Sequence, residues 1–294
     1  MLGRILTIQR EGPVDWGRFI WSDTHRVVYG PVPSRRLGSS LGINLFPGRK
    51  MCSFGCIYCD CGPTVRRKGL KEGEYVPGRE LIRKIKEGLL EVKDQDVHID
   101  FITFSGNGES TLHPDFPEIA EAVARFRNRI FPAVPLAIFT NGVHLDRRKV
   151  REALKFFDLP IVKLDAPDQK GMEEINRPGP SFTIAELLGN FHSLPRVCLS
   201  TAVIPGPKGN VGSLKSEEYL KIIEEVDPIE VHLYSFDYPT FDHDLYRASE
   251  GLMLQIAKFI ATSLPFTVKV ISRRNPHPEA PPLYKEGEIL RRTE

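Results

Sequence analysis

Four of the five cysteines lie within the ten residues 52–61, and their types and spacing suggest chemistry more clearly than any other feature of the sequence. Cys52, Cys56 and Cys59 are spaced C-x3-C-x2-C. A loop this short can turn three thiolates toward one face of an iron–sulfur cube, in which thiolates are the preferred soft ligands. Electron-transfer clusters ordinarily take four cysteines, so three ligands would leave one iron for a substrate or cofactor.

The fourth cysteine of this segment, Cys61, leaves two other interpretations open. As a fourth ligand it would complete a structural zinc site in a non-catalytic RNA-binding module, although zinc sites more often join two C-x2-C pairs about 12–20 residues apart. A plain thiol redox protein would need a C-x-x-C before a helix in a thioredoxin-like unit. The remaining cysteine, Cys198, lies in the apolar run VCLSTAV and is expected to be a small core residue.

Strands and helices alternate along the chain from about residue 40, and these elements must position the cysteines. Apolar and β-branched runs predict strands, and apolar residues at i, i+3, i+4 and i+7 predict helices. Strands are expected at 40–46, 99–106, 134–142, 160–166, 196–204, 229–236 and 266–272. Helices are expected at 80–93, 115–129, 146–157, 182–192, 216–226 and 245–264, with Asp115 and Asp146 at the start of two of them.

This alternation predicts an α/β fold with a parallel sheet, because each crossover helix must pass over one face of the sheet. We expect a partial (β/α)6 TIM-like barrel with a short N-terminal extension and a C-terminal tail; a doubly wound sheet is the alternative. The expected divisions are an extension or cap at 1–30, the barrel at 31–272 and the tail at 273–294. Barrel chemistry lies at the carboxyl ends of the strands, so the residues after each strand are the candidates.

Polar residues follow several of these strands. After the second strand come glycines that let a ligand approach the backbone, and Glu109, whose carboxylate could bind an ammonium group. Asn141 follows the third strand, and Asp165 ends the fourth, with Asn176 and Arg177 further on. Acids and arginines at strand ends also pair with each other, so a purely structural role for these residues stays open.

The cysteine loop, with the aromatic Tyr58 before its last cysteine, resembles the signature of the radical S-adenosylmethionine (radical SAM) enzymes. In that family three cysteines hold one [4Fe–4S] cluster, and its open iron binds SAM. Reductive cleavage of SAM then gives a 5′-deoxyadenosyl radical that abstracts hydrogen from a substrate. The resemblance implies that Cys52, Cys56 and Cys59 are the metal ligands, and that a low-potential electron donor of the ferredoxin or flavodoxin type is a partner.

The resemblance also implies a SAM-binding set. Ser105–Glu109 looks like the family's Gly-Gly-Glu element, which binds the amino group of SAM; Asn107 looks like an insertion, of a residue type that tolerates left-handed backbone. Tyr58 would lie beside the adenine, Asp165 near the ribose or carboxylate, and Arg177 near the carboxylate. The implied cofactor-binding residues are Tyr58, Gly106, Asn107, Gly108, Glu109, Asn141, Asp165, Asn176 and Arg177.

Within the superfamily, the segment 29–38 and the Ser-Gly-Asn-Gly-Glu element look like a branch related to the wyosine-forming tRNA enzymes. Archaeal wyosine enzymes carry upstream cysteines for a second cluster, whereas no cysteine precedes Cys52 here, so one cluster is expected. The substrate is left undetermined, with RNA as one candidate. Short basic clusters such as Arg35-Arg36 could track a phosphate backbone, although solvated faces account for most of them.

The composition fits an ordinary soluble globular protein. The 294 residues include 40 Lys and Arg and 38 Asp and Glu, which gives a net charge of +2. With 41% apolar and 27% charged residues, disorder and a supercharged nucleic-acid binder are excluded. No apolar run approaches the roughly 18–20 residues of a membrane helix, and the start lacks a secretory cleavage site. A cytoplasmic enzyme without a membrane partner is expected.

Overall fold

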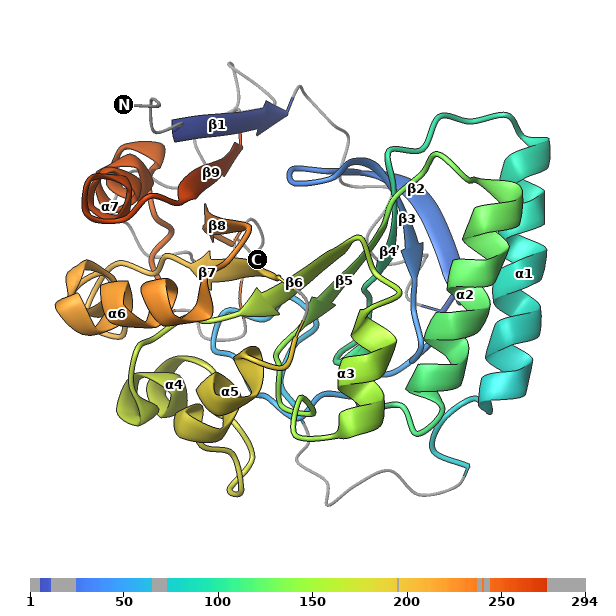
Figure 1. Ribbon diagram of the computed structural model, residues 1–294, viewed down its shortest axis with the longest axis horizontal. Helices are drawn as coiled ribbons and strands as arrows, with labels where there is room; N and C mark the ends of the chain where they lie inside the picture. Colours follow the sequence, from blue (N-terminus) through green and yellow to red (C-terminus); the bar gives the residue numbers. More distant parts are fainter. Residues whose placement is uncertain are drawn as a thin grey trace.

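The computed structural model describes residues 6–11, 25–64, 73–194, 196–236, 240 and 244–273, which form one nine-stranded curled sheet with helices along its outer side (Figure 1). The strand order is β1-β9-β8-β7-β6-β5-β4-β3-β2. Strands β3 to β9 pair in parallel in chain order, whereas β2 is antiparallel to β3. The strands are β1 (Leu6–Glu11), β2 (Val28–Ser34), β3 (Gly38–Ile43), β4 (Phe101–Phe104), β5 (Leu136–Thr140), β6 (Leu159–Lys163), β7 (Cys198–Ala202), β8 (Glu230–Tyr234) and β9 (Thr267–Arg273).

Helical crossovers join the parallel strands, so the structure confirms the expected partial TIM-like barrel. The helices are α1 (Gly78–Asp94), α2 (Phe116–Ile130), α3 (Arg148–Leu154), α4 (Gln169–Ile175), α5 (Ile184–Phe191), α6 (Glu217–Val226) and α7 (Glu250–Ser263). Two short 3-10 helices, η1 (Ser110–Leu112) and η2 (Ser213–Lys215), follow β4 and β7. From β2 to β9 the strands lie in chain order across the sheet, which a doubly wound sheet would not show.

The two faces of the sheet have different side chains. Ile138 of β5, Val162 of β6 and Leu199 of β7 are fully buried in the large apolar core between the sheet and the helices. Because successive side chains of a strand point to opposite faces, the neighbours of these residues lie on the inner, concave face. That inner face carries polar side chains among apolar ones, including Lys163 and Ser200.

Several local expectations need correction. Neither β2 nor α4 was expected, and β3 ends at Ile43 rather than at residue 46. Asp115 precedes α2 without a side-chain capping bond, because its carboxylate instead accepts a hydrogen bond from Gly78 N, 2.9 Å away, at the start of α1. Helix α3 is preceded by Arg147 rather than Asp146.

The expected division into extension, barrel and tail stays a prediction. β1 lies inside the proposed extension and pairs in parallel with β9. The tail beyond Arg273 and the basic run 66–68 lie outside the described residues. None of the helices in the described part of the chain has the length and apolar character needed to cross a membrane.

Candidate metal and cofactor site

The cysteine loop lies at the carboxyl end of the sheet, held between two segments that are distant in sequence. Met51 pairs with the turn after β4: its N–H donates to Asn107 O at 2.8 Å, and its carbonyl accepts from Glu109 N at 2.9 Å. Farther along the loop, Gly55 N donates to Asn176 O at 2.9 Å, beyond the end of α4. These backbone bonds bring the cysteines, the Gly-rich turn and the segment after α4 into one site.

Each of the three predicted sulfur ligands has a nitrogen donor beside it. Asn141 Nδ2 lies 3.7 Å from Cys52 Sγ, Asn176 Nδ2 lies 3.4 Å from Cys56 Sγ, and Lys50 Nζ lies 3.1 Å from Cys59 Sγ. Donors of this kind stabilise thiolates and orient metal-bound sulfur. The structure therefore brings the three cysteines and two of the predicted polar residues together.

The ionisation of these thiols fits ligands of a soft metal group. Burial, with a contribution from the neighbouring Cys56, raises the pKa of Cys52 to about 12. Burial likewise raises the pKa of Cys56 to about 11. Buried thiols of this kind become thiolates when a cationic centre compensates their charge, and three thiolates suit an iron–sulfur cluster. The donor set therefore fits the group that the sequence resemblance implies.

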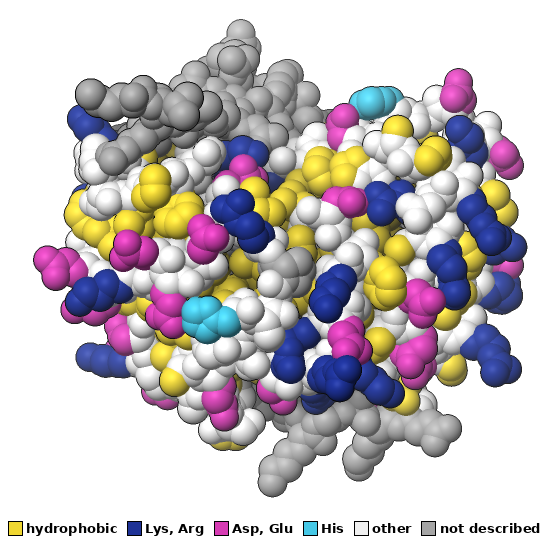
Figure 2. All heavy atoms as spheres, in the orientation of Figure 1, with side chains coloured by type: hydrophobic (Ala, Val, Ile, Leu, Met, Phe, Trp, Pro, Cys, Tyr) yellow, Lys and Arg dark blue, Asp and Glu magenta, His cyan; other side chains and the backbone are white. Residues whose placement is uncertain are grey.

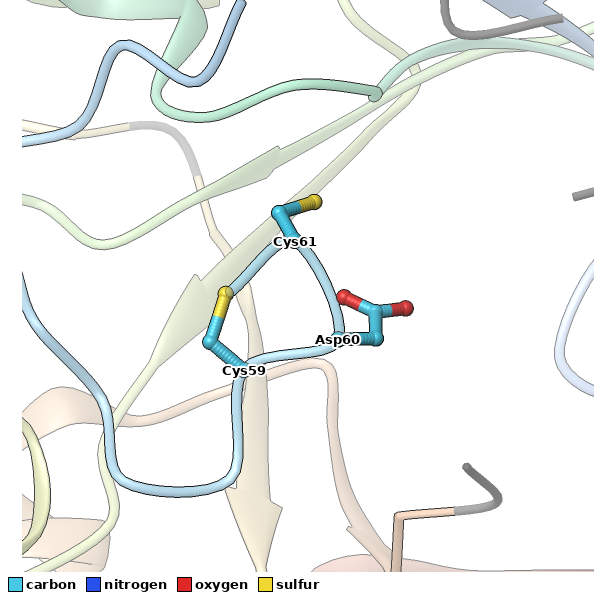
Figure 3. Close-up of side chains that lie close together, drawn as sticks. All are labelled: Cys59, Asp60 and Cys61. Atoms are coloured by element: carbon cyan, nitrogen blue, oxygen red, sulfur yellow. The ribbon is translucent and has the colours of Figure 1, made fainter. Parts of the chain in front are cut away.

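Cys61 differs from the other three cysteines of the loop. Figure 3 shows it close to Cys59 and Asp60, and the ligand atoms of these three residues lie within 4.8 Å of one another. The hydrogen bond between the two thiols lowers the pKa of Cys59 to about 6 and raises that of Cys61. In a tetrahedral zinc site all four sulfurs would lie about 3.8 Å apart, since each Zn–S bond is ~2.3 Å. Among the described residues, the structure does not gather Cys52 and Cys56 with this group at such spacing.

The Glu109 carboxylate is buried beside the cysteine loop and accepts hydrogen bonds from the residues around it. Oε1 accepts hydrogen bonds from Thr111 N at 3.1 Å, from Thr111 Oγ1 at 2.7 Å and from Thr140 Oγ1 at 2.8 Å. Oε2 accepts one, from Asn141 N at 2.7 Å. Burial raises the pKa of Glu109 overall, and these donors oppose the rise. Oε2 retains capacity for a second donor, such as an ammonium group.

The turn before Glu109 depends on its two glycines. Gly106 and Gly108 have φ of 129° and 133°, values that other residues rarely adopt. The tolerance of asparagine for left-handed backbone plays no part at Asn107, because this residue is not among those with positive φ. Its Nδ2 instead donates to Phe46 O at 3.1 Å and ties the turn to the segment after β3.

A second polar cluster adjoins Cys56. Asp165 is fully buried and accepts hydrogen bonds from Asn176 Nδ2 at 2.6 Å, from Ala202 N at 2.7 Å and from the Tyr58 hydroxyl. Lys163 Nζ lies 3.5 Å from the same carboxylate. Asn176 Oδ1 is buried with no hydrogen-bond partner among the described residues. A buried amide oxygen in this state fits a ligand that supplies a hydroxyl or an N–H group.

The tertiary structure changes the roles expected for three basic residues near the site. Arg177 is exposed with φ of 46°, and its carbonyl accepts from Gly55 N at 3.1 Å, so its backbone is what holds the loop. Lys50 was expected only as part of a short basic cluster, Arg49-Lys50, and Lys163 was not expected in the site. The sequence does contain a hint of each residue's place in the site. Side chains alternate along a strand, so Lys163 lies on the same face as Asp165. Lys50 stands two residues before Cys52.

Asn176 offers a direct test of the sulfur environment. Asn176→Asp would remove the donor to Cys56 Sγ and place a second carboxylate beside Asp165. We expect iron to be lost to a chelator about tenfold faster, because outer hydrogen-bond partners typically contribute at least this much to metal retention. The measurement is the rate of absorbance loss after chelator addition. Asn190→Asp, whose side chain bonds Glu186 O and Arg151 rather than a sulfur, is the matched control, and equal rates in the two variants would contradict the assignment.

Cys198, Glu230 and His232 form a separate group on the inner face, with ligand atoms within 4.8 Å of one another. Cys198 is fully buried, as expected of a core residue, and His232 is 1% exposed. His232 Nε2 lies 2.6 Å from Glu230 Oε1, and Lys269 Nζ lies 2.6 Å from Glu230 Oε2. The carboxylate is already engaged by these two groups, so the trio is not a ready metal site.

The basic side chains are mixed with acidic ones on the face in Figure 2. Ion pairs one helical turn apart account for several of them, including Arg83–Glu87 at 2.8 Å and Arg148–Glu152 at 2.7 Å. Among the basic clusters named from the sequence, this accounts for Arg148, and the expectation for the remaining clusters stays a prediction.

Comparisons with known proteins extend the sequence resemblance. A family model described as the radical SAM superfamily matches residues 49–211. A UPF0026 protein of Helicobacter pylori strain J99 is 29% identical over 292 residues, covering 91% of this chain and 91% of that protein. A UPF0026 protein of Methanocaldococcus jannaschii is 35% identical over 162 residues, covering 55% of this chain but only 47% of its own length.

A solved structure shares the fold. The structure of TYW1 with a lysine-pyruvate adduct bound has a TM-score of 0.52 and 17% identity, and the match covers 77% of this chain and 75% of that one. The curled sheet with outer helices is therefore a known architecture, and the family match lies on the segment that holds the cysteine loop and the polar residues around it.

Proposed function

Because this chain belongs to the radical SAM superfamily, we propose that Cys52, Cys56 and Cys59 hold one [4Fe–4S] cluster and that the surrounding residues bind SAM. When bound, the cluster supplies the electron that cleaves SAM reductively to a 5′-deoxyadenosyl radical, which abstracts hydrogen from a substrate. The substrate, the overall reaction type and the electron donor, of the ferredoxin or flavodoxin type, belong to this proposal. So does a cytoplasmic location, where thiols stay reduced.

One residue carries the proposal, because it joins the two halves of the site. Asn141 N donates to Glu109 Oε2 at 2.7 Å, while Asn141 Nδ2 contacts Cys52 Sγ at 3.7 Å and Ser53 Oγ at 3.1 Å. The sulfur ligands and the carboxylate that would bind the SAM ammonium are therefore adjacent. A sulfur-only structural site would have no use for a buried carboxylate at this place.

Different residues of the chain would bind different parts of SAM. Glu109 holds the ammonium group through Oε2, a charge-assisted bond strengthened by burial. Asn176 Oδ1 accepts a donor from the nucleoside, and Asp165 fixes the Asn176 amide by accepting from its Nδ2. Tyr58 is 7% exposed, and its ring lies beside Asp165 and Asn176. The buried sheet wall and the cysteine loop exclude water from the reacting atoms.

The proposal is tested on anaerobically purified and reconstituted protein. We expect brown protein with about four irons per chain, a change in the electron paramagnetic resonance signal on SAM addition, and 5′-deoxyadenosine after reduction. Glu109→Gln should keep the iron but weaken SAM binding about 100-fold. The substitution removes the charge-assisted bond to the SAM ammonium, and the new glutamine N–H would face the N–H and hydroxyl groups that now donate to Glu109. Protein that stays free of iron after reconstitution would contradict the proposal.

A further inference from the structure

The middle of the inner face keeps accessible side chains where a closed, filled barrel would bury them. Phe139 of β5, Lys163 of β6 and Tyr234 of β8 are each partly exposed, although their neighbours along the strands are buried. The Lys163 side chain is 20% exposed. Interiors of small barrels are normally filled by side chains, so this accessible patch is a place for a ligand.

A residue from the turn between β2 and β3, at the other end of the strand order from β7 and β8, contacts this patch. Arg36 lies in the turn between β2 and β3, and its Nη1 donates to Ser200 Oγ at 2.8 Å. Its guanidinium carbon lies 4.0 Å from the centre of the Tyr234 ring and 5.2 Å from that of Phe139. The next residue, Leu37, is 3% exposed and packs in an apolar cluster on the inner face. The turn therefore covers one end of the inner face and fixes the Arg36 guanidinium there.

Lys163 approaches the same tyrosine from the cysteine-loop side. Its Nζ donates to Tyr234 OH at 2.6 Å and lies 5.0 Å from the ring centres of both Tyr234 and Tyr58. Burial by itself would lower the pKa of Lys163, but the neighbouring Asp165, Tyr234 and Cys56 together outweigh burial and raise it, so the ammonium is retained. Arg36 and Lys163 therefore both lie against one aromatic ring, and Lys163 also adjoins the proposed SAM site.

A polar atom on the same face also lacks a partner. His232 lies opposite Ser200 in the β7–β8 register, and its Nδ1 is buried without a hydrogen-bond partner among the described residues. Buried ring nitrogens are normally satisfied by protein, water or ligand. Because Nε2 donates to the Glu230 carboxylate, Nδ1 of the neutral ring is an acceptor, so a hydroxyl or N–H group of an occupant, rather than the anion itself, would satisfy it.

We propose that Arg36, Lys163 and Tyr234 form the binding site for an anionic group, a carboxylate or a phosphate, of a small-molecule substrate. Lys163 is already paired with Asp165 at 3.5 Å, so what an anion gains here is a charge-assisted hydrogen bond from each of the two side chains. An arginine fork suits both of these planar or tetrahedral oxyanions. The inference rests on the proposed function, because it places the substrate beside the cofactor that would attack it.

Equilibrium dialysis of the reconstituted protein against labelled inorganic phosphate and, separately, labelled acetate tests the site. We expect one of the two anions to bind, and Arg36→Gln and Lys163→Gln each to weaken it about tenfold, because each removes one charge-assisted contact. Arg148→Gln, whose side chain is 84% exposed on α3, is the matched control and should bind as the wild type does. The preferred anion then identifies the substrate's charged group.

Iron content, thermal unfolding and 5′-deoxyadenosine formation, measured on the same preparations, separate the two proposals. Absence of binding of both anions, or binding that neither Arg36→Gln nor Lys163→Gln weakens, overturns the anion site while leaving SAM cleavage intact. A chain without iron that still binds the anion overturns only the proposed function. If Arg36→Gln weakens the binding of tRNA and no small anion binds, the small-molecule assignment is wrong. A variant with an unchanged unfolding midpoint shows that its effect is not misfolding.

Discussion

Replacing Cys52, Cys56 or Cys59 by alanine should abolish the iron–sulfur centre, and SAM cleavage should fall by more than about 100-fold. Each sulfur has its own donor, from Asn141, Asn176 and Lys50 respectively, and each substitution would leave only two of the three proposed ligands. The measurements are iron and sulfide content after anaerobic reconstitution and the yield of 5′-deoxyadenosine.

Cys61→Ala is the matched control, because it removes a thiol from the same loop. Cys61 is exposed and donates to Gly106 O at 3.7 Å, and although its thiol adjoins Cys59 it is not one of the three proposed ligands. The cluster should therefore survive this change. A four-thiolate zinc site would instead lose its metal in all four variants, so zinc lost together with Cys61 would establish the zinc interpretation.

Gly108→Ala should give the largest loss of stability among glycine substitutions at the site. With φ of 133°, the backbone there disfavours any side chain, and a Cβ would overlap the Met51 carbonyl oxygen. That oxygen accepts the hydrogen bond from Glu109 N that holds the cysteine loop to the turn after β4. We expect the free energy of unfolding to fall by about 3 kcal/mol, and iron retention to fall with it. Urea unfolding and iron analysis measure both.

Gly189→Ala is the control for this change. Gly189 lies within α5, and a Cβ there would meet nothing within 4 Å. Alanine in a helix interior is favoured over glycine, so the variant should be more stable by about 0.5–1 kcal/mol. Similar losses in the two variants would show that the close approach of Gly108 to Met51 is unimportant.

The sequence by itself predicted the architecture, and it is the source of the proposed sulfur ligands. Continuous apolar runs identify strands that are covered on one side by helices, and the helical period identifies the crossovers, because both signals are local. The C-x3-C-x2-C spacing is also local, and the family match on residues 49–211 agrees with the resemblance seen in it. Short elements were missed: α4 has seven residues and β2 carries two prolines, so neither gives a periodic signal long enough to read.

Only the tertiary structure decided which polar residues work together. Asn141 contacts both Cys52 and Glu109, and Arg36 reaches Ser200 across 164 positions of sequence. Such meetings depend on strand register and on the curl of the sheet, and a shift of one residue would turn Lys163 to the helix-covered face. Spacing along the chain fixes what a loop can ligate, whereas the side chains that approach it from other strands are set by how the whole sheet closes.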